Sequence, residues 1–346
     1  MWAIELHDPK AGGMGATAMD AELGERSNVL VTGATGRIGF PIARALARHH
    51  SVYGLARCGK PGDEERLRRA GIEPIVGDVA DIDLCSLPSN LTHVFHAAAR
   101  IGREADSDWH RTFEVNAQVT GRLIAACDGV LGFVFCSSGS TYAYQGRRPL
   151  REDDPPGVHL GVYSLSKIAA EAVARFASVK YEVPLTIIRI FSTYGPLGGA
   201  PADRLERIRA GKEIVLHPDA PNNYNPIYED DYVRLGIRAM QVATVPPVTV
   251  NWAGSETVSA EDYCAYLGDL IGKHVRVRYD ERAPWPLWPD VTLMHEVLGQ
   301  TQVPWREGMR RLVEARVRST TVAAPSDGVG ESTNPATAPR IDPAGP

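Results

Sequence analysis

A tyrosine and a lysine stand four positions apart in a stretch with helical periodicity, residues 162–183. Tyr163 and Lys167 therefore lie on one face of the expected helix, about one turn apart. A neighbouring ammonium group favours the phenolate, so it lowers the pKa of the tyrosine from about 10 toward the working pH. The spacing is common by chance, but it makes Tyr163 a candidate general acid/base for a carbonyl or alcohol oxygen.

A glycine-rich loop, T-G-A-T-G-R-I-G at residues 32–39, lies between an apolar run and a helical pattern. Glycines let the backbone turn sharply and approach a pyrophosphate, whose charge then lies at the helix N-terminus. The spacing is G-x-x-G-x-x-G, and the alternative is an ordinary strand–helix turn. At the start of an α/β pattern the loop predicts a dinucleotide site. The expected cofactor contacts are Gly33, Thr35, Gly36, Arg37, Ile38 and Gly39.

The second expected strand, 51–56, ends where NAD-binding proteins place an acidic residue for the ribose 2′-hydroxyl. Ala56 occupies that position, and Arg57 follows it. A guanidinium group instead pairs with the 2′-phosphate of NADP, and Arg37 is a second candidate for this contact. The sequence therefore favours NADP over NAD, the alternative being that both arginines are solvated surface residues.

Two serines stand at the end of the fifth expected strand, 132–137, as Ser137-Ser138-Gly139. In a parallel sheet the carboxyl ends of the strands face the ligand crevice. A serine there can hydrogen-bond the reacting oxygen beside Tyr163, whereas alone it would be equally well explained as a turn residue.

Short apolar runs alternate with helical patterns through the first two thirds of the chain. This alternation predicts an α/β fold, a Rossmann-type doubly wound parallel sheet with right-handed crossovers and a smaller C-terminal substrate lobe. Strands are expected at 28–32, 51–56, 72–77, 92–98, 132–137 and 185–191. Helices are expected at 37–49, 64–70, 107–127, 162–183, 202–210, 229–242 and 259–271.

The domain boundaries follow from composition. Residues 1–26 lack a signal-peptide pattern and are expected to be a disordered extension, and the proline-rich tail 319–346 is expected to be disordered as well. Residues 27–195 would form the dinucleotide-binding domain. Residues 196–318 would form the substrate lobe and could return elements to the main sheet.

Composition excludes several classes of protein. The 346 residues carry a formal net charge of −5, which gives no electrostatic footprint for nucleic acid, and no apolar run is long enough to cross a membrane. The five cysteines include no C-x-x-C pair and the ten histidines show no metal spacing. We expect a cytoplasmic protein with a small-molecule substrate and no bound metal.

Together these motifs resemble the extended short-chain dehydrogenases/reductases, the NAD-dependent epimerase/dehydratase family, from residue 28 to about 270. Several motifs in the right order make this resemblance far more specific than any one of them. The matching motifs are the loop at 32–39, Gly77-Asp78-Val79, His96-Ala97-Ala98-Ala99, Asn116, Ser137-Ser138, Tyr163 with Lys167, and the segment 189–196.

The resemblance implies roles for particular residues. Ser138, Tyr163 and Lys167 would be the catalytic set. Tyr163 and Lys167 would also contact the cofactor, and Lys167 would hold the nicotinamide ribose. Further cofactor contacts would be Asp78 and Val79 beside the adenine, Ala97, Ala98 and Ala99 through their backbone, Asn116 as support for the active-site helix or a proton relay, and Phe191 near the nicotinamide.

Departures from the family pattern bear on the substrate. Gly139-Ser140 stand where 4,6-dehydratases carry an Asp-Glu pair, which argues against dehydration, and Ser192 replaces a usual asparagine. No arginine stands in the few residues before the Asp230-Asp231 pair, from Tyr224 on, where nucleotide-sugar enzymes place a diphosphate contact. The candidate replacements are Arg204, Arg207 and Arg209, and the positions expected to face substrate are Ser138, Gly139, Ser140 and Ser192.

The sequence thus predicts an NAD(P)-dependent oxidoreductase or epimerase that acts on a secondary alcohol or ketone of a sugar-like or other small substrate. The alternatives are a nucleotide-sugar 4-epimerase with non-standard diphosphate contacts and a non-catalytic NAD(P)-binding regulator. Small residues along 168–176, together with the family's habit of pairing this helix and the preceding one, predict a homodimer.

Overall fold

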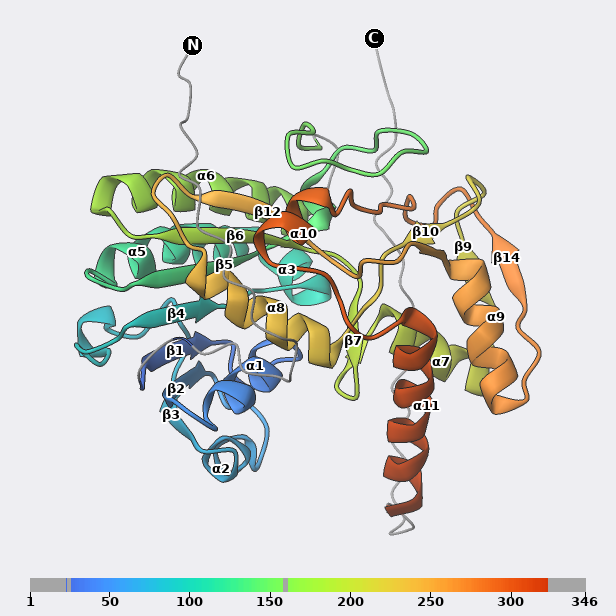
Figure 1. The fold of residues 1–346 in the computed structure, drawn as a ribbon, viewed down its shortest axis with the longest axis horizontal. Coiled ribbons are helices and arrows are strands. Elements are labelled where there is room, and N and C mark those ends of the chain that lie inside the picture. Colours follow the sequence, from blue (N-terminus) through green and yellow to red (C-terminus); the bar gives the residue numbers. More distant parts are fainter. Residues whose placement is uncertain (1–22, 24–25, 158–160, 323–346) are drawn as a thin grey trace, which may run out of the picture.

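A seven-stranded parallel sheet forms the larger lobe of the protein, whose computed structural model describes residues 23, 26–157 and 161–322 (Figure 1). The strand order is β12-β6-β5-β4-β1-β2-β3, and all neighbouring pairs are parallel. This arrangement confirms the predicted Rossmann-type doubly wound sheet. The strands are β1 (Asn28–Thr32), β2 (Ser51–Ala56), β3 (Ile72–Val76), β4 (His93–His96), β5 (Gly132–Ser138), β6 (Leu185–Ile190) and β12 (Val248–Trp252).

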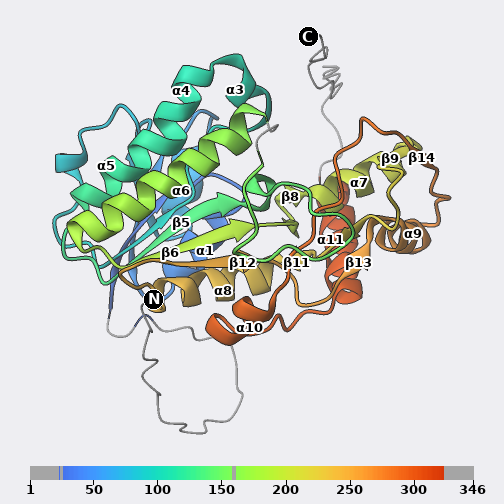
Figure 2. The same cartoon turned by 90° about the horizontal axis from the view of Figure 1, so that it is seen from above.

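Helices cover both faces of this sheet, so its central strands β4 and β5 are buried along their whole length. Leu30 and Phe133 belong to the core under α5 and α6, whereas Ile188 and Trp252 belong to the core under α1 and α8. Figure 2 shows the two helical layers on opposite sides of the strands. The helices of this lobe are α1 (Gly39–Leu46), α2 (Asp63–Arg69), α3 (Gly102–Ser107), α4 (Trp109–Phe113), the π-helical turn η2 (Glu114–Gln118), α5 (Val119–Ala126), α6 (Val162–Tyr181), α8 (Glu229–Gln241) and α10 (Thr292–Val297), with the 3₁₀ turns η1 (Leu84–Ser86) and η3 (Gly139–Thr141).

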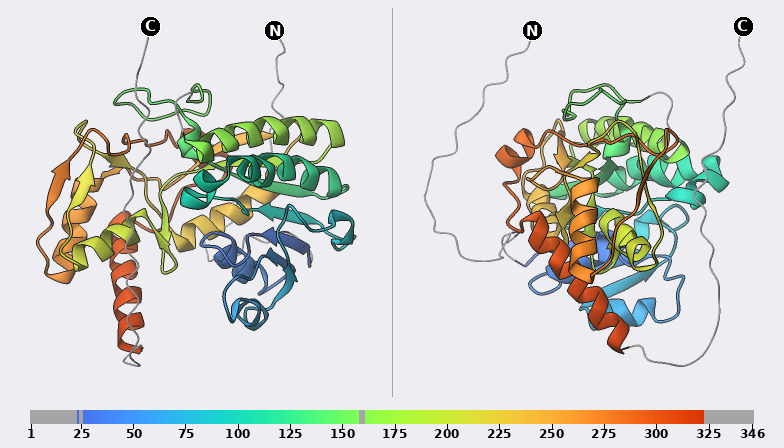
Figure 3. Two further views of the ribbon diagram at one scale, coloured as in Figure 1. Left: turned by 180° about the vertical axis from the view of Figure 1, so that it is seen from behind. Right: turned by 90° about the vertical axis from the view of Figure 1, so that its right-hand side faces the viewer.

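A second, smaller lobe lies beyond the carboxyl ends of the strands (Figure 3). Its own core joins Tyr194, Leu205, Tyr263 and Leu312, which are all almost completely buried. The elements of this lobe are β7 (Thr193–Gly195), β8 (Gly198–Gly199), α7 (Ala200–Arg209), β9 (Ile214–Leu216), β10 (Asn223–Tyr224), β11 (Ile227–Tyr228), β13 (Val258–Ser259), α9 (Ala260–Ile271), β14 (Val277–Tyr279) and α11 (Trp305–Val322).

The lobes are not separated at a single point in the sequence. After the first part of the small lobe the chain returns to the sheet, where α8 packs on one face and β12 pairs with β6. The predicted helix at 107–127 is divided by the π-helical turn, and α11 extends past the predicted end at 318. The predicted extension 1–26 lies almost wholly outside the described residues, as does most of the predicted tail.

Candidate active site

A cavity of about 940 Å³ opens at the carboxyl ends of β1, β2, β4 and β5. The strand order reverses between β1 and β4, and ligands bind at this point in doubly wound sheets. The predicted residues in the cavity wall are Gly33, Thr35, Gly36, Arg37, Ile38, Gly39, Arg57, Asp78, Val79, Ala97, Ala98, Ala99, Ser138, Tyr163, Lys167 and Phe191.

The glycine loop is folded tightly against the end of β4. Gly33 has a φ of +68°, and a Cβ atom built on it would lie 2.9 Å from the backbone nitrogen of Ala98. Behind the loop the Thr32 hydroxyl accepts a hydrogen bond from the Ala98 backbone at 3.1 Å and contacts Nδ1 of His96 at 2.7 Å. The glycines thus present bare backbone to the cavity at the start of α1, and this cradle fits the pyrophosphate of a dinucleotide.

The Ser138 hydroxyl lies close enough to the Tyr163 phenol to lower its pKa, so the structure brings together two members of the predicted catalytic set. Burial raises the pKa of Tyr163, while the Ser138 hydroxyl and the charge of Arg37 act in the opposite direction. Ser138 is also 2.9 Å from the Ser140 hydroxyl, which accepts a hydrogen bond of 2.9 Å from Ser164. A chain of hydroxyl groups therefore fixes Ser138 beside the phenol.

Lys167 lies on the same face of α6 as Tyr163, but its ammonium group is hydrogen-bonded to another residue. Its Nζ donates to the backbone oxygen of Cys136 at 2.7 Å and lies 4.8 Å from the centre of the Phe135 ring. Burial lowers the pKa of Lys167 to about 8. The prediction that the Lys167 ammonium lowers the pKa of Tyr163 is wrong, because burial has the larger effect and raises that pKa.

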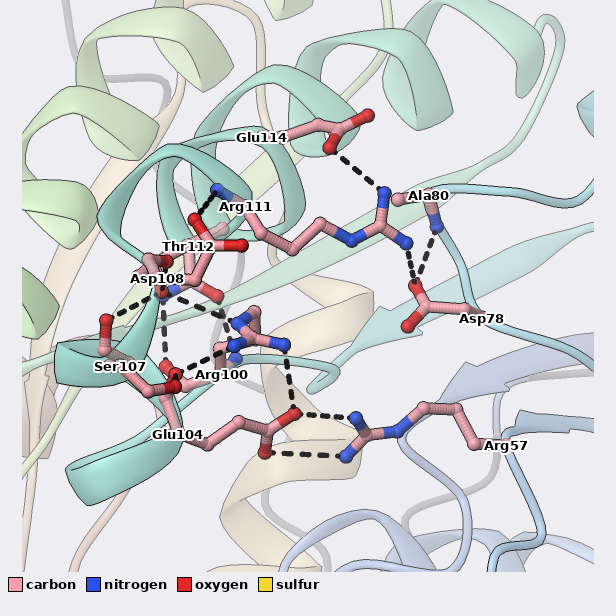
Figure 4. Close-up of polar contacts among 12 residues, drawn as sticks. Arg57, Asp78, Ala80, Arg100, Glu104, Ser107, Asp108, Arg111, Thr112 and Glu114 are labelled. Atoms are coloured by element: carbon pink, nitrogen blue, oxygen red, sulfur yellow. Dashed lines mark hydrogen bonds and ion pairs between the residues drawn. The ribbon is translucent and has the colours of Figure 1, made fainter.

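At the β2 end of the cavity, Arg57 lies in the wall but its guanidinium group is paired with Glu104 of α3 (Figure 4). Lys60 and Asp63 lie in the same part of the wall. Arg37 is oriented differently from the sequence expectation. An added Cβ atom at Gly198 would lie 3.5 Å from its Cδ, so the side chain reaches the β7–β8 turn of the small lobe.

Asn116 is completely buried behind the cavity wall rather than in it. Its side chain accepts a hydrogen bond from the Arg100 backbone at 2.8 Å and donates to the Ser166 hydroxyl at 2.9 Å. It lies in the π-helical turn η2, a geometry often found at functional sites. Asn116 therefore connects the loop after β4 to the helix that carries Tyr163.

The predicted substrate positions are distributed differently. Gly139 packs on the Phe191 ring, which an added Cβ atom would meet at 2.6 Å, and Ser140 belongs to the hydroxyl chain. Ser192 lies outside the cavity wall, and its backbone oxygen accepts from Ile227. Sequence reasoning missed Ser164 and Glu104. Ser164 could have been found from its place beside Tyr163, whereas no pattern marks Glu104.

Of the three arginines of α7, one faces inward. The Arg204 guanidinium lies 4.9 Å from the centre of the Tyr224 ring and donates to that tyrosine's hydroxyl at 3.3 Å. Arg207 instead donates to the backbone oxygen of Glu213 at the surface, and Arg209 pairs with Glu206. Arg204 thus approaches Tyr224, which occupies the region of the missing family arginine.

The sequence profile of the NAD dependent epimerase/dehydratase family matches residues 29–252. This chain belongs to that family. It is an NAD(P)-dependent enzyme of the extended short-chain dehydrogenase/reductase type, as the motifs predicted. The described residues contain no cluster of His, Cys, Asp and Glu suited to a metal ion, and none of their helices is long and apolar enough to span a membrane.

Relatives of two activities are found. UDP-glucuronate 4-epimerase 4 of Arabidopsis thaliana is 31% identical over 62% of this chain, which spans only 54% of that protein. The dTDP-4-dehydro-6-deoxy-D-allose reductase of Streptomyces bikiniensis is 28% identical over 84% of this chain and 96% of that protein. Among solved structures, MoeE5 in complex with UDP-glucose and NAD superposes with a TM-score of 0.73 at 25% identity, covering 85% of this chain and 99% of MoeE5.

Proposed function

We propose that the enzyme interconverts a secondary alcohol and a ketone on a sugar-like substrate. The presence of Ser138, Tyr163 and Lys167 in the same cavity wall as the glycine loop carries this proposal. A bound nicotinamide supplies or accepts the hydride. Ser138 would hold the substrate oxygen, Tyr163 would give or take its proton, and Lys167 would keep a positive charge on the same face of α6.

The direct test is turnover of a panel of free ketoses and nucleotide sugars by the purified enzyme, with each nicotinamide cofactor. Net oxidation of the reduced cofactor would identify a reductase, whereas an isomerised sugar without net cofactor change would identify an epimerase. Tight cofactor binding with no turnover of any ketone or nucleotide sugar would contradict the proposal and support the non-catalytic regulator.

Nucleotide-sugar 4-epimerisation is the second candidate, because relatives bear UDP-sugar epimerase names and Arg204 faces the interior of the small lobe. One guanidinium nitrogen of Arg204, Nη1, is buried without a hydrogen-bond partner among the described residues. A substrate phosphate would satisfy a buried cationic donor of this kind. Turnover restricted to sugars that carry a nucleoside diphosphate would favour this candidate. Turnover of free ketoses would show that the enzyme does not require the diphosphate.

We further propose that NADP is preferred over NAD, which the Ala56-Arg57 sequence at the end of β2 supports. Replacing Arg57 with alanine should weaken NADPH binding by roughly 1–3 kcal/mol, the cost of a lost charge-assisted contact, and leave NADH binding unchanged. Fluorescence titration of both cofactors measures this difference. Equal wild-type affinities for NADPH and NADH would contradict the preference.

A homodimer is proposed from the outer face of α6. Leu165, Ala172, Phe176 and Val179 recur at helical spacing on this face, and the Phe176 side chain is 67% exposed. Such a row buried around a two-fold axis would form an isologous contact. Light scattering at micromolar concentration should show a dimer, and Phe176→Glu should give a monomer. The matched change Val277→Glu, at an exposed strand of the small lobe, should not alter the mass.

The location proposed is the cytoplasm, because all five cysteines are free thiols and Cys127, Cys136 and Cys264 are buried. Burial raises the pKa of each of these three thiols and so disfavours the thiolate form.

A further inference from the structure

An ion pair spans the β2 end of the cavity. Arg57 follows the last residue of β2, and Glu104 comes from α3, on the opposite side (Figure 4). The guanidinium donates twice to the carboxylate, from Nη1 to Oε1 at 2.5 Å and from Nη2 to Oε2 at 3.4 Å. The group expected to bind a 2′-phosphate therefore already has a carboxylate partner.

Glu104 is held in place independently of Arg57. Its Oε1 also accepts from Nη1 of Arg100 at 3.2 Å, and its backbone oxygen accepts from Nη2 of the same arginine at 2.7 Å. The backbone of Arg100 is fixed in turn by Asn116. The Arg57 side chain is 56% exposed and that of Glu104 is 34% exposed, so Arg57 is the partner that is freer to turn away.

The carboxylate of Asp78, in the same cavity wall, is already matched. Asp78 accepts from the backbone of Ala80 at 3.0 Å and lies 3.4 Å from the Arg111 guanidinium, which also pairs with Asp81 and Glu114. A 2′-phosphate approaching this end therefore meets the Glu104 carboxylate as a competitor for Arg57. A partly exposed ion pair is weak and can be displaced, whereas phosphate binds a guanidinium strongly.

We propose that Glu104 is a specificity-determining residue that competes with the 2′-phosphate of NADP for Arg57. With NAD the Arg57–Glu104 pair stays intact. With NADP the guanidinium turns to the phosphate, and the carboxylate remains with Arg100. Glu104 thereby limits the preference for NADP and allows NAD to bind as well. This inference rests on the proposed role of Arg57 in NADP binding.

The test is a set of binding titrations of NADPH and NADH to the purified full-length protein, without substrate. Glu104→Gln keeps the side-chain length and the backbone bond to Arg100 but removes the competing charge. It should tighten NADPH binding roughly three- to tenfold and change NADH binding by less than about twofold, as for loss of an exposed ion pair and its repulsion of phosphate. As a matched control, Glu114→Gln removes one carboxylate charge from the neighbouring pair with Arg111. It should leave the ratio of NADPH affinity to NADH affinity unchanged.

The Arg57→Ala background separates this inference from the cofactor proposal. In that background, Glu104→Gln should no longer tighten NADPH binding selectively, because there is no Arg57 guanidinium left for the change to release. If Arg57→Ala leaves the ratio of NADPH affinity to NADH affinity unchanged, Arg57 does not bind the 2′-phosphate, and the inference about Glu104 is overturned as well. If that ratio falls but Glu104→Gln has no selective effect in the wild-type background, only the role of Glu104 is overturned. Weaker binding of both cofactors to Glu104→Gln would also overturn it, because Glu104 would then hold a group common to both.

Discussion

Replacing Tyr163 with phenylalanine is expected to lower kcat by about 10²- to 10⁴-fold, the usual contribution of a general acid/base. The change removes the phenolic hydroxyl and leaves the ring, so the packing of α6 is retained. Ser138 loses one partner but keeps its contact with the Ser140 hydroxyl. The measurement is steady-state turnover of whichever substrate the panel identifies, at saturating cofactor.

Two controls make this expectation specific. Cofactor affinity and thermal midpoint should stay close to wild type, because the hydroxyl contributes to neither the glycine loop nor the core. Ser164→Ala removes a hydroxyl from the next residue, one that reaches Ser138 only through Ser140, and should cost much less activity. A Tyr163→Phe enzyme with wild-type kcat would remove Tyr163 from the mechanism.

Much of the site could be predicted because it depends on local rules. The glycine spacing at 32–39 and the four-residue interval between Tyr163 and Lys167 each fix a local geometry. The carboxyl ends of parallel strands then bring these segments to one edge of the sheet. The positions in the cavity wall follow from these constraints, and the family resemblance gave their order along the chain.

What could not be predicted depends on contacts between distant segments. Helical spacing places Lys167 on the Tyr163 face, but it does not determine the partner of the amine, the Cys136 carbonyl of β5. Glu104 belongs to a six-residue helix with no apolar period, so its approach to Arg57 has no sequence signature. The sequence allowed elements of 196–318 to return to the sheet, but it did not identify β12 as one of them, for the same reason. Its run of β-branched residues indicates a strand, but sequence order does not give sheet order.

A buried ion-pair network lies directly behind the carboxyl end of β5. The Glu171 carboxylate accepts hydrogen bonds from Ser137 at 2.6 Å, from Nε and Nη2 of Arg189 at 2.9 and 2.8 Å, and from Arg175 at 2.9 Å. Ser137 and Arg189 are neighbours in the β5–β6 register, next to Ser138. Burial opposes the charged form of Glu171, but the bonds and charges of its partners outweigh burial and lower its pKa.

Replacing Glu171 with alanine should therefore reduce the free energy of unfolding by about 3–5 kcal/mol at neutral pH, because the Arg189 guanidinium, whose side chain is 11% exposed, would lose its carboxylate. Urea unfolding measures this change. Arg189→Ala should destabilise the protein by a similar amount, since it leaves the same carboxylate incompletely paired. The matched change Glu64→Ala, at a half-exposed pair with Arg68, should cost no more than about 1 kcal/mol.

The pH dependence distinguishes the lost ion pair from the lost volume of the side chain. A carboxyl whose pKa is lowered in the folded protein stabilises it fully above its ordinary value of 4.5, and this contribution is lost as the pH falls through the lowered value. The stability difference between wild type and Glu171→Ala should thus be constant near neutrality and shrink below pH 4.5. A difference that is the same at all pH values would attribute the effect to a cavity alone, and a difference below 1 kcal/mol at pH 7 would show that Arg189 finds another partner.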